Sequence, residues 1–488
     1  MATTFQTVDR ATPYILPQSI EDWLPDDHLA RFVVEIVGKL DLGPLRASYA
    51  GRGSMPYDPG MLLALLFYGY ATGVRSSRKI ETATYDSIAF RYISANSHPD
   101  HDTIASFRLT FLERIPEYFV RILEVAREMG LRKVGSISLD GTKVKANASK
   151  HRAMSYAHAR KIRKQLEDEV KELLRMAEEA DRNEKRTVID VPEELKRREK
   201  RLDLIEEAIK EIERRAAEQY RMEKEEYDAK MAAMEKQEKA TGKKRKGKKP
   251  AEPKPGPADK DQVNFTDDES RIMPVSGGGF EQAYNAQAAV DNESRLIVAV
   301  DLGRSSVDKQ ALQPVLEDMK RNPEGLTTPE SLLADAGSCS KANVDYCEER
   351  GIEPLISIGR EQHNMPLVER CGGGVETGCT SEETENSCAV SKSEFCEEAE
   401  GESRPTVDKC FGRAVDNSME RMKARLKTPE GRAEYGKRKG VVEPVFGIIK
   451  EVLKFRQFLL RGMKKAKGEW TLACMAYNLK RMHIMQAS

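Results

Sequence analysis

The sequence lacks any apolar run of about 18 residues, which is the length that a helix needs to cross a bilayer. Residues 1–10 also lack the basic start and apolar centre of a secretory signal. The longest apolar stretch, residues 61–70, is typical of a buried helix. We therefore expect a cytoplasmic protein with no membrane partner.

Recognisable metal-binding spacings are equally scarce. None of the eight cysteines forms a CxxC pair, and the seven histidines form no ligand-spaced cluster. Five cysteines gather between residues 371 and 410 at spacings of 8, 9, 8 and 14, which fit no common zinc module. The spacing favours reduced thiols in a cytosolic protein, and a zinc site is the alternative.

Net charge is also absent, because 80 Lys and Arg balance 80 Asp and Glu. The distribution along the chain is uneven. Residues 421–488 hold 17 basic and 5 acidic side chains, whereas residues 369–402 hold 2 basic and 10 acidic ones. A basic block that also carries aromatic rings suits a polyanion such as DNA. The alternative is a solvated helical surface.

The first 130 residues have apolar side chains at the spacing of three to four that is typical of helices. Helix starts are indicated near Asp27, Pro59, Ser76 and Asp102. Basic residues near several of these starts indicate an all-helical DNA-binding domain. A domain that serves only for packing is the alternative.

Apolar runs further along the chain predict five strands, in the order of three strands, a helix, a strand, a helix and a strand. A helix that carries Glu443 follows them. This order predicts an α/β fold with a mixed five-stranded sheet and flanking helices. The runs are residues 134–142, 282–291, 294–302, 332–335 and 353–358.

A long helical insertion separates the first strand from the second. Apolar residues recur at steps of three and four in residues 156–177 and again in residues 202–216, with charge on the other faces. Residues 182–192 interrupt this pattern. The simplest structure is an antiparallel helical hairpin that projects from the core, and a dimerising coiled coil is the alternative.

The patterns divide the chain into seven segments. They are an all-helical domain (1–130), the first part of the core (131–152), a helical hairpin or coiled-coil insertion (153–240), a basic disordered linker (241–265), the second part of the core (266–368), an acidic cysteine-containing insertion (369–415) and the C-terminal basic part of the core (416–488).

Three acidic residues lie at ends of these elements. Asp140 and Asp335 each end an apolar strand, and Glu443 opens a helix. Mg²⁺ prefers hard oxygen ligands, and two such ions can activate the attacking oxygen and stabilise the leaving oxygen of phosphodiester transfer. We therefore expect the three acids to bind two Mg²⁺ or Mn²⁺ ions, although each acid alone is more typical of a cap or a surface residue.

The helix that Glu443 opens would carry Pro444 in its first turn, where proline is tolerated. At steps of four, three and four, Gly447, Lys450 and Lys454 would then share one face with Glu443. This face would carry an acid at the metal, a glycine that allows close approach, and two cations along a phosphate track.

With these residues the chain resembles bacterial insertion-sequence transposases, whose RNase H-like catalytic core carries two aspartates and one glutamate (DDE). The most specific resemblance is to the Tyr-Arg-Glu-Lys signature, with Tyr435, Arg438, Glu443 and Lys450. The spacing from Arg438 to Glu443 is one residue longer than the commonest form, so either Arg438 or Lys439 would contact phosphate. Further similar segments are residues 76–81, 99–108, 139–149, 278–291, 428–450, 455–462 and 469–472.

The resemblance implies that metal-activated water nicks the ends of the element and that the freed 3′-hydroxyl attacks target DNA. It implies catalytic and metal-binding roles for Asp140, Asp335 and Glu443, and a homodimer that acts on terminal inverted repeats at the nucleoid. For Trp470, stacking on an unpaired base is one interpretation and a core position is the favoured other. The implied DNA-binding residues are Tyr435, Arg438, Lys439, Lys450, Lys454, Arg461 and Trp470.

Two other functions fit the same residues. One is an RNase H-like nuclease that cuts DNA without joining it, which would yield no strand-transfer products. The other is a catalytically inactive DNA-binding relative, which would bind DNA whether or not Mg²⁺ is present.

Overall fold

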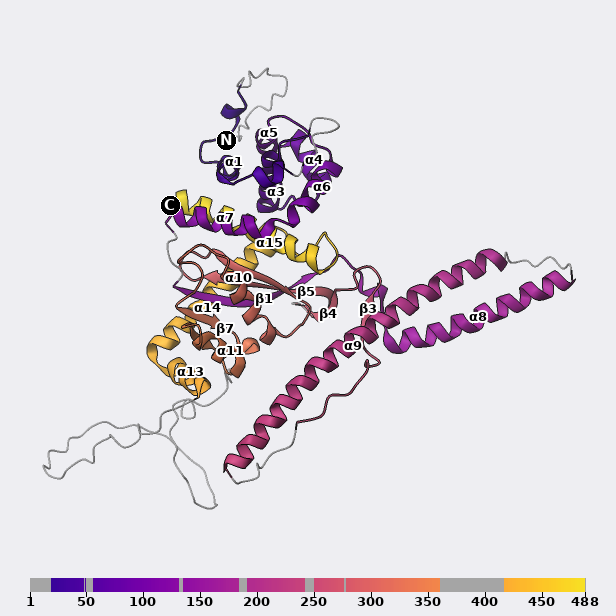
Figure 1. Ribbon diagram of the computed structural model, residues 1–488. Helices are drawn as coiled ribbons and strands as arrows, with labels where there is room; N and C mark the ends of the chain where they lie inside the picture. Colours follow the sequence, from indigo (N-terminus) through magenta and orange to yellow (C-terminus); the bar gives the residue numbers. More distant parts are fainter. Residues whose placement is uncertain are drawn as a thin grey trace, which may run out of the picture.

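The computed structural model describes residues 19–47, 49, 56–130, 135–183, 191–241, 250–275, 278–359 and 417–487 (Figure 1). The acidic cysteine-containing insertion, residues 369–415, lies outside the described residues, as do residues 242–249 of the basic linker. Of the eight cysteines, Cys339, Cys347 and Cys474 are described, and all three are free thiols.

The N-terminal region is all-helical, which confirms that part of the predicted fold. Helix α3 (Pro59–Thr72) lies at its centre, because its residues are apolar on almost every side and nearly all of them are buried. Asp58 caps this helix by accepting from the backbone N–H groups of Gly60 and Met61. The helices around it are α1 (Leu29–Lys39), α2 (Gly43–Arg46), α4 (Ser77–Asp86), α5 (Ile88–Ile93), α6 (His101–Leu112) and α7 (Ile115–Glu128).

The core sheet follows the predicted order of strands and helices. Strand β1 pairs antiparallel with β5 and parallel with β7, which pairs parallel with β8. Strand β6 pairs antiparallel with β5, as expected for the hairpin. The strands are β1 (Ser136–Lys145), β5 (Phe280–Asp291), β6 (Ile297–Gly303), β7 (Ser331–Ala334) and β8 (Glu353–Ile356).

The sheet has one strand more than the sequence predicts. Strand β4 (Arg271–Pro274) pairs with the start of β5, so the sheet has six strands. Strand β4 is short and lacks a clear apolar alternation, which is why the pattern of residues does not reveal it.

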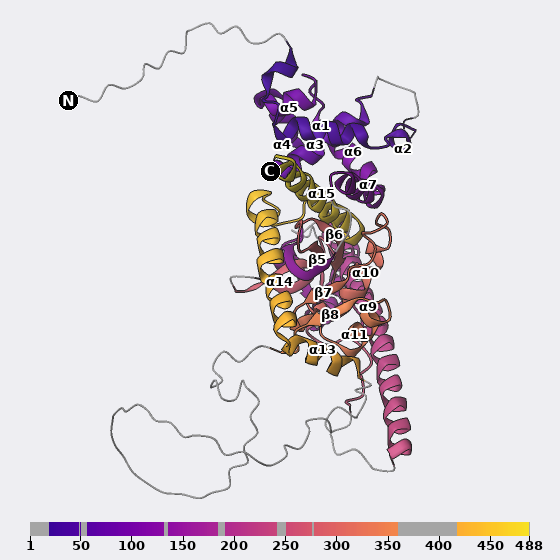
Figure 2. The same cartoon turned by 90° about the vertical axis from the view of Figure 1, so that its left-hand side faces the viewer.

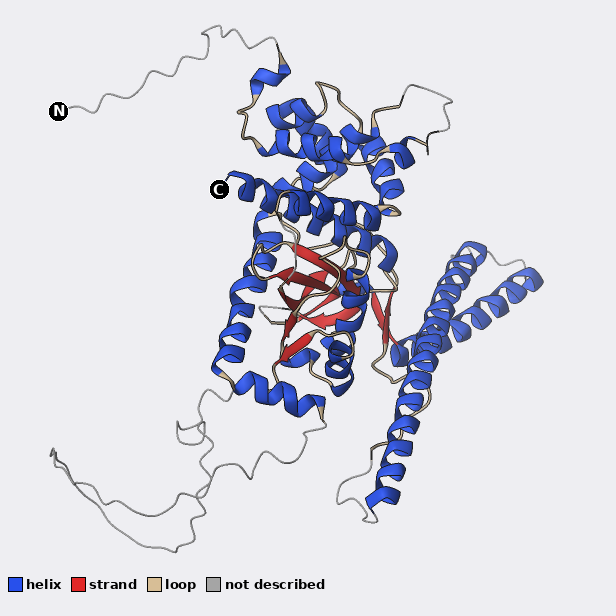
Figure 3. Ribbon diagram, turned by 60° about the vertical axis from the view of Figure 1, so that its left-hand side comes forward, coloured by secondary structure: helices blue, strands red, loops and turns tan. Residues whose placement is uncertain are grey.

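Helices cover the sheet and join it to the N-terminal region (Figures 1 and 3). Helix α15 (Met463–Ala487) lies between the sheet and the N-terminal helices and packs against α3, α7 and β6. Helix α10 (Leu312–Met319) packs on β6, and α14 (Pro429–Gly447) runs along β1 (Figure 2). The remaining helices of the core are α11 (Lys341–Glu348) and α13 (Ser418–Lys427).

The insertion forms a helical hairpin that projects from the core (Figures 1 and 3). Helix α8 (Tyr156–Asn183) packs on α9 (Val191–Thr241) of the same chain through an apolar cluster that includes Leu166, Ile205 and Ile209. A small sheet of β2 (Ala153–Ser155) and β3 (Gln262–Asn264) closes its base. The prediction of a linker through residue 265 is therefore wrong at its end, where residues 262–264 are paired.

The prediction that Glu443 opens a helix is wrong. Helix α14 begins at Pro429, so Glu443 lies near its C-terminal end and Pro444 lies inside it. Pro444 cannot donate a hydrogen bond to the carbonyl of Gly440, but Gly440 is exposed, so water can satisfy that group. A π-helical turn, Ile448–Val452, follows and changes the helical period, so Glu443 and Lys454 do not lie on one regular face.

Candidate active site at strands β1 and β7

The register of β1 and β7 brings Asp140 and Asp335 together. The last parallel pair of residues is Leu139 and Ala334. Asp140 directly follows Leu139, and Asp335 directly follows Ala334. Both aspartates are partly buried. Asp335 also caps a short 3₁₀ turn by accepting from the backbone N–H of Ser338 at 3.3 Å. Two carboxylates from distant parts of the sequence therefore lie side by side where β7 ends against the middle of β1. Strand β1 continues to Lys145, so the prediction that Asp140 ends its strand is wrong.

Helix α14 places a cation against this pair. Nη1 of Arg438 donates to Oδ2 of Asp140 at 3.0 Å, and the Arg438 and Asp140 side chains are 11% and 23% exposed. Glu434, one turn earlier, accepts from Lys437 and from Ser136, and these hydrogen bonds lower its pKa. Helix and strand therefore run in the same direction, with Glu434 near the start of β1 and Arg438 at Asp140.

The charge of Asp140 is only partly compensated. Burial raises the pKa of its carboxyl, and Arg438 and the backbone N–H of Gly141 act against that shift without cancelling it. The negative charge of Asp335 raises the same pKa further. Burial acts against the charge of Arg438, but Asp140, Tyr435 and Asp335 outweigh it and raise the pKa of that guanidinium. An added cation would relieve the repulsion between the two carboxylates.

A second polar group, which the sequence analysis missed, adjoins this pair. Oδ1 of Asp308 accepts from Nδ2 of Asn285 at 2.7 Å, from Nε2 of Gln287 at 2.7 Å and from Nζ of Lys143 at 3.4 Å. In the register of β1 and β5, Gln287 faces Gly141 and Asn285 faces Lys143. The available signal was a strand of alanine and valine interrupted by two amide side chains spaced two residues apart.

The third predicted acid is not part of this group. Glu443 is exposed on α14, and none of its side-chain contacts reaches Asp140 or Asp335 in the described structure. Within the described residues, no three His, Cys, Asp or Glu side chains stand close enough together to hold a metal ion. The structure thus assembles two of the three predicted acids with Arg438.

The predicted DNA-binding residues differ in how far they are exposed. Tyr435 is half-buried beside Arg438, and Lys439 is exposed. Lys450 is half-buried, and burial lowers its pKa, as does the charge of Lys143. Lys454 is exposed in a left-handed backbone conformation (φ 54°) directly after the π-helical turn.

The remaining two DNA-binding predictions fare differently. Arg461 is exposed, and its Nε donates to the carbonyl of Asn147 at 3.1 Å. Trp470 is fully buried and donates from Nε1 to the carbonyl of Gln287 at 3.0 Å. Its indole is closed off by the sheet and by Phe455, so stacking on a base is wrong for this residue and the core interpretation holds.

A buried glutamate fixes the segment that carries Lys454 and Arg461. Glu469 accepts from the backbone N–H groups of Leu459 (2.9 Å) and Leu460 (3.0 Å) and from the hydroxyl of Tyr70 (3.1 Å). Nη1 of Arg75 lies 3.7 Å from the same carboxylate. Since Tyr70 and Arg75 belong to the N-terminal region, this network joins that region to the α/β core.

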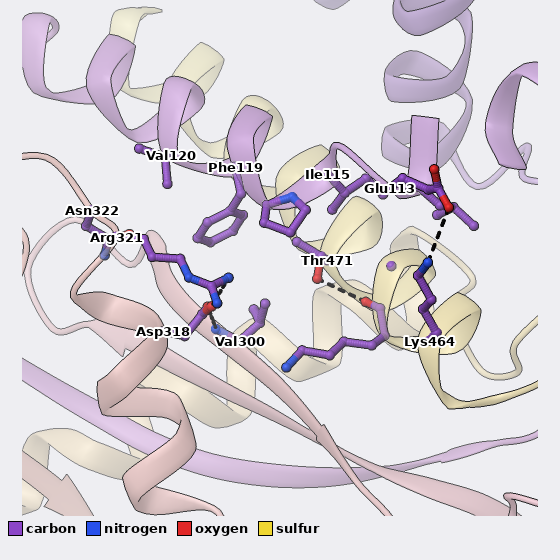
Figure 4. A pocket seen from close by; sticks show the side chains of 14 residues that line it. Glu113, Ile115, Phe119, Val120, Val300, Asp318, Arg321, Asn322, Lys464 and Thr471 are labelled. Atoms are coloured by element: carbon purple, nitrogen blue, oxygen red, sulfur yellow. Dashed lines mark hydrogen bonds and ion pairs between the residues drawn. The ribbon is translucent and has the colours of Figure 1, made fainter. Parts of the chain in front are cut away.

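A cavity of about 200 Å³ lies at the same junction, away from the carboxylates (Figure 4). Residues of α7, α10 and α15 line it, including Phe119, Asp318 and Thr471. Its walls are mainly apolar, and none of the predicted site residues belongs to them. We regard it as a packing gap between the N-terminal region and the core.

The architecture and the paired aspartates define the class of protein. A mixed α/β core with two acids side by side on neighbouring strands, joined to an all-helical N-terminal region, fits an enzyme that uses metal ions to process nucleic acid. Residues 253–479 match the family model of the Transposase DDE domain, and residues 18–109 match the Transposase domain (DUF772). Both matches are to transposase domains, so the chain is similar to DDE transposases over these residues, and the DDE match implies an RNase H-like fold for the core.

The DDE match includes Asp335 and Glu443, whereas Asp140 lies before its first residue. No curated protein and no solved structure matched the chain. Among the described helices, none combines the length and the apolar character that crossing a membrane requires.

Proposed function

We propose that this transposase cleaves the ends of an insertion sequence and joins them to target DNA, with Asp140, Asp335 and Glu443 as its catalytic, metal-binding residues. The observation that carries the proposal is the placement of Asp140 beside Asp335 by the register of β1 and β7. The match of residues 253–479 to the Transposase DDE domain supports the reaction class.

The residues at this site fit Mg²⁺ or Mn²⁺. The donors are carboxylate oxygens, which such hard cations prefer, and the burial of Asp140 leaves its negative charge poorly solvated. Bound divalent ions, two in the usual arrangement, would activate the attacking oxygen and stabilise the leaving one. Asp140 would hold the ions from the middle of β1, and Asp335 from the end of β7.

Glu443 would complete the site only after α14 adjusts. The helix already lies along β1 and brings Arg438 to Asp140. Its end contains Pro444 and continues into a π-helical turn, and both features interrupt regular helical hydrogen bonding. We propose that rotation of this segment, when DNA binds, turns the exposed Glu443 toward the two aspartates.

Arg438 would contact a phosphate of the DNA and release Asp140 for the metal. The cations that would extend this contact are exposed or half-buried residues of the same region: Lys439, Lys450, Lys454 and Arg461. Tyr435 would support Arg438. The partners are the terminal inverted repeats and target DNA at the nucleoid, and a homodimer would hold two ends together for joining.

The test is a strand-transfer assay on a labelled duplex that carries an element end, with Mg²⁺ or Mn²⁺ and a second DNA as target. Wild type should release a 3′-hydroxyl end and join it to the target, and Glu443→Gln should do neither. Cleavage without joined products in wild type would favour a nuclease. DNA binding that ignores Mg²⁺, with no cleavage, would favour an inactive relative and contradict the proposal.

A further inference from the structure

One acid near the paired aspartates has no role in the proposed reaction. Asp308 begins the 3₁₀ turn Asp308–Gln310, between β6 and α10, and so reaches the end of the sheet from a different element than Arg438. Three donors, from Asn285, Gln287 and Lys143, converge on its Oδ1. They fix the orientation of the carboxylate while using only one of its two oxygens.

The second oxygen of Asp308 faces the same space as Asp335. A methyl group added to Gly337 would lie 3.4 Å from Oδ2 of Asp308, and 3.1 Å and 3.3 Å from Oδ1 and Oδ2 of Asp335. The two carboxylates therefore approach one point from two sides. Two like charges in such proximity repel each other unless a cation lies between them.

An unsatisfied buried oxygen gives an independent indication of a ligand. Asn285 is 2% exposed, and its Oδ1 has no hydrogen-bond partner. This oxygen would lie 2.9 Å from a methyl group on Gly141, and Nε2 of Gln287 would lie 2.1 Å from it, so both amides crowd the residue next to Asp140. A buried acceptor without a donor costs about 1–3 kcal/mol, which a ligand or its bound water would recover.

We infer that Asp308 is a further metal ligand, which binds a divalent cation together with Asp335 while the Asn285 amide accepts a hydrogen bond from the cation's water. This inference rests on the proposed function, because it assigns a ligand to the same metal site. The carboxylate of Asp308 already lies beside Asp335, whereas Glu443 would have to move to reach the site. It also explains the glycines at 141 and 337, where a side chain would enter the amide group or the space between the carboxylates.

The test is a titration of the full-length protein with Mn²⁺, in which electron paramagnetic resonance measures the free ion. Wild type should bind Mn²⁺, and Asp308→Asn and Asp335→Asn should each bind at least about tenfold more weakly. The matched control is Asp301→Asn, since Asp301 is a partly buried acid of the same core that pairs with Lys467 at 2.6 Å. This control should bind like wild type.

The outcomes separate the inference from the proposed function. If Asp335→Asn weakens Mn²⁺ binding and Asp308→Asn matches the control, the inference fails and the proposed site stands. If wild type does not bind Mn²⁺, or if neither variant changes binding, both fail.

Gly337→Ala serves as the second variant if Asp308→Asn does not fold, as judged by its melting temperature. It removes no charge and no hydrogen bond but fills the space that both carboxylates face. Mn²⁺ binding weakened by Gly337→Ala supports the inference, and unchanged binding overturns it.

Discussion

Two acidic residues of this protein, Glu469 and Asp140, are both held at raised pKa by burial, yet their surroundings differ. Glu469 is completely buried and receives hydrogen bonds from two backbone N–H groups and the Tyr70 hydroxyl, with Arg75 nearby. Asp140 is 23% exposed, has one arginine and one backbone N–H as partners, and lies beside another carboxylate.

The comparison distinguishes Glu469, which stabilises the fold, from Asp140, which we propose to bind a metal ion. The carboxylate of Glu469 accepts hydrogen bonds from the protein itself. Replacing Glu469 should therefore weaken the junction between the N-terminal region and the core. Asp140 lies beside a like charge and faces solvent on one side, which costs stability and is typical of functional sites. Variants at the two positions should therefore affect different quantities.

The largest effect should follow neutralisation of the paired aspartates. Asp140→Asn or Asp335→Asn should lower the rate of metal-dependent cleavage of a labelled element end by about 10³-fold or more, because each removes a proposed metal ligand. The midpoint of urea unfolding should change little. Asp301→Asn should retain the wild-type rate. Cleavage at the wild-type rate by Asp140→Asn would exclude Asp140 as a catalytic residue.

Loss of the buried glutamate should be the largest effect on stability. Glu469→Ala leaves two backbone N–H groups and the Tyr70 hydroxyl without their acceptor and Arg75 without its counter-ion, and we expect the unfolding free energy to fall by about 3–5 kcal/mol in urea titration. Glu113→Ala is the matched control, since Glu113 pairs with Lys464 at the same junction but both side chains are largely exposed. Equal losses in the two variants would contradict the structural role of Glu469.

A smaller effect is expected for the cation at the site. Arg438→Ala should reduce the slope of log K against log salt for DNA binding by about 1, because one phosphate contact is lost. Binding at increasing salt, measured by fluorescence anisotropy, gives this slope. Arg321→Ala provides the comparison, since Arg321 is an exposed arginine at the junction cavity that pairs with Asp318. An unchanged slope in Arg438→Ala would exclude the phosphate contact.

The smallest effect should be on the pH dependence of stability. The raised pKa of Asp140 means that the folded state holds this proton more tightly than the unfolded state. The stabilising contribution is thus complete below the unfolded pKa of the group and is lost as pH rises through its raised folded pKa. Urea unfolding of wild type and Asp140→Asn across this range should show wild type losing stability relative to the variant as pH rises. Parallel profiles would contradict the shift.

The sequence predicted the features that depend on local patterns. Apolar alternation identified the strands that place Asp140 and Asp335. The expected strand-end position holds for Asp335, whereas β1 continues past Asp140 to Lys145. Helical spacing identified the hairpin and the N-terminal helices. These features follow from neighbouring residues, so one chain without a structure suffices to find them.

The sequence did not predict all of the features that depend on long-range packing. The sequence left Trp470 between a DNA contact and the favoured core position, and the structure decides for the core, because α15 is enclosed by the sheet and by N-terminal helices. Pro444 suggested a helix start, although an exposed Gly440 allows proline inside α14. The cluster of Asp308 with Asn285 and Gln287 exists only through strand register and a turn between β6 and α10.

The most direct test of the paired-carboxylate site replaces Mg²⁺ with Fe²⁺ in the full-length protein and adds peroxide and ascorbate, so that radicals cut the chain near the bound metal. We predict cuts next to Asp140 and next to Asp335, lost in Asp140→Asn and in the presence of excess Mg²⁺. Cuts confined to other parts of the chain, such as the cysteine-rich residues 371–410, would show that the metal binds elsewhere and would contradict the site.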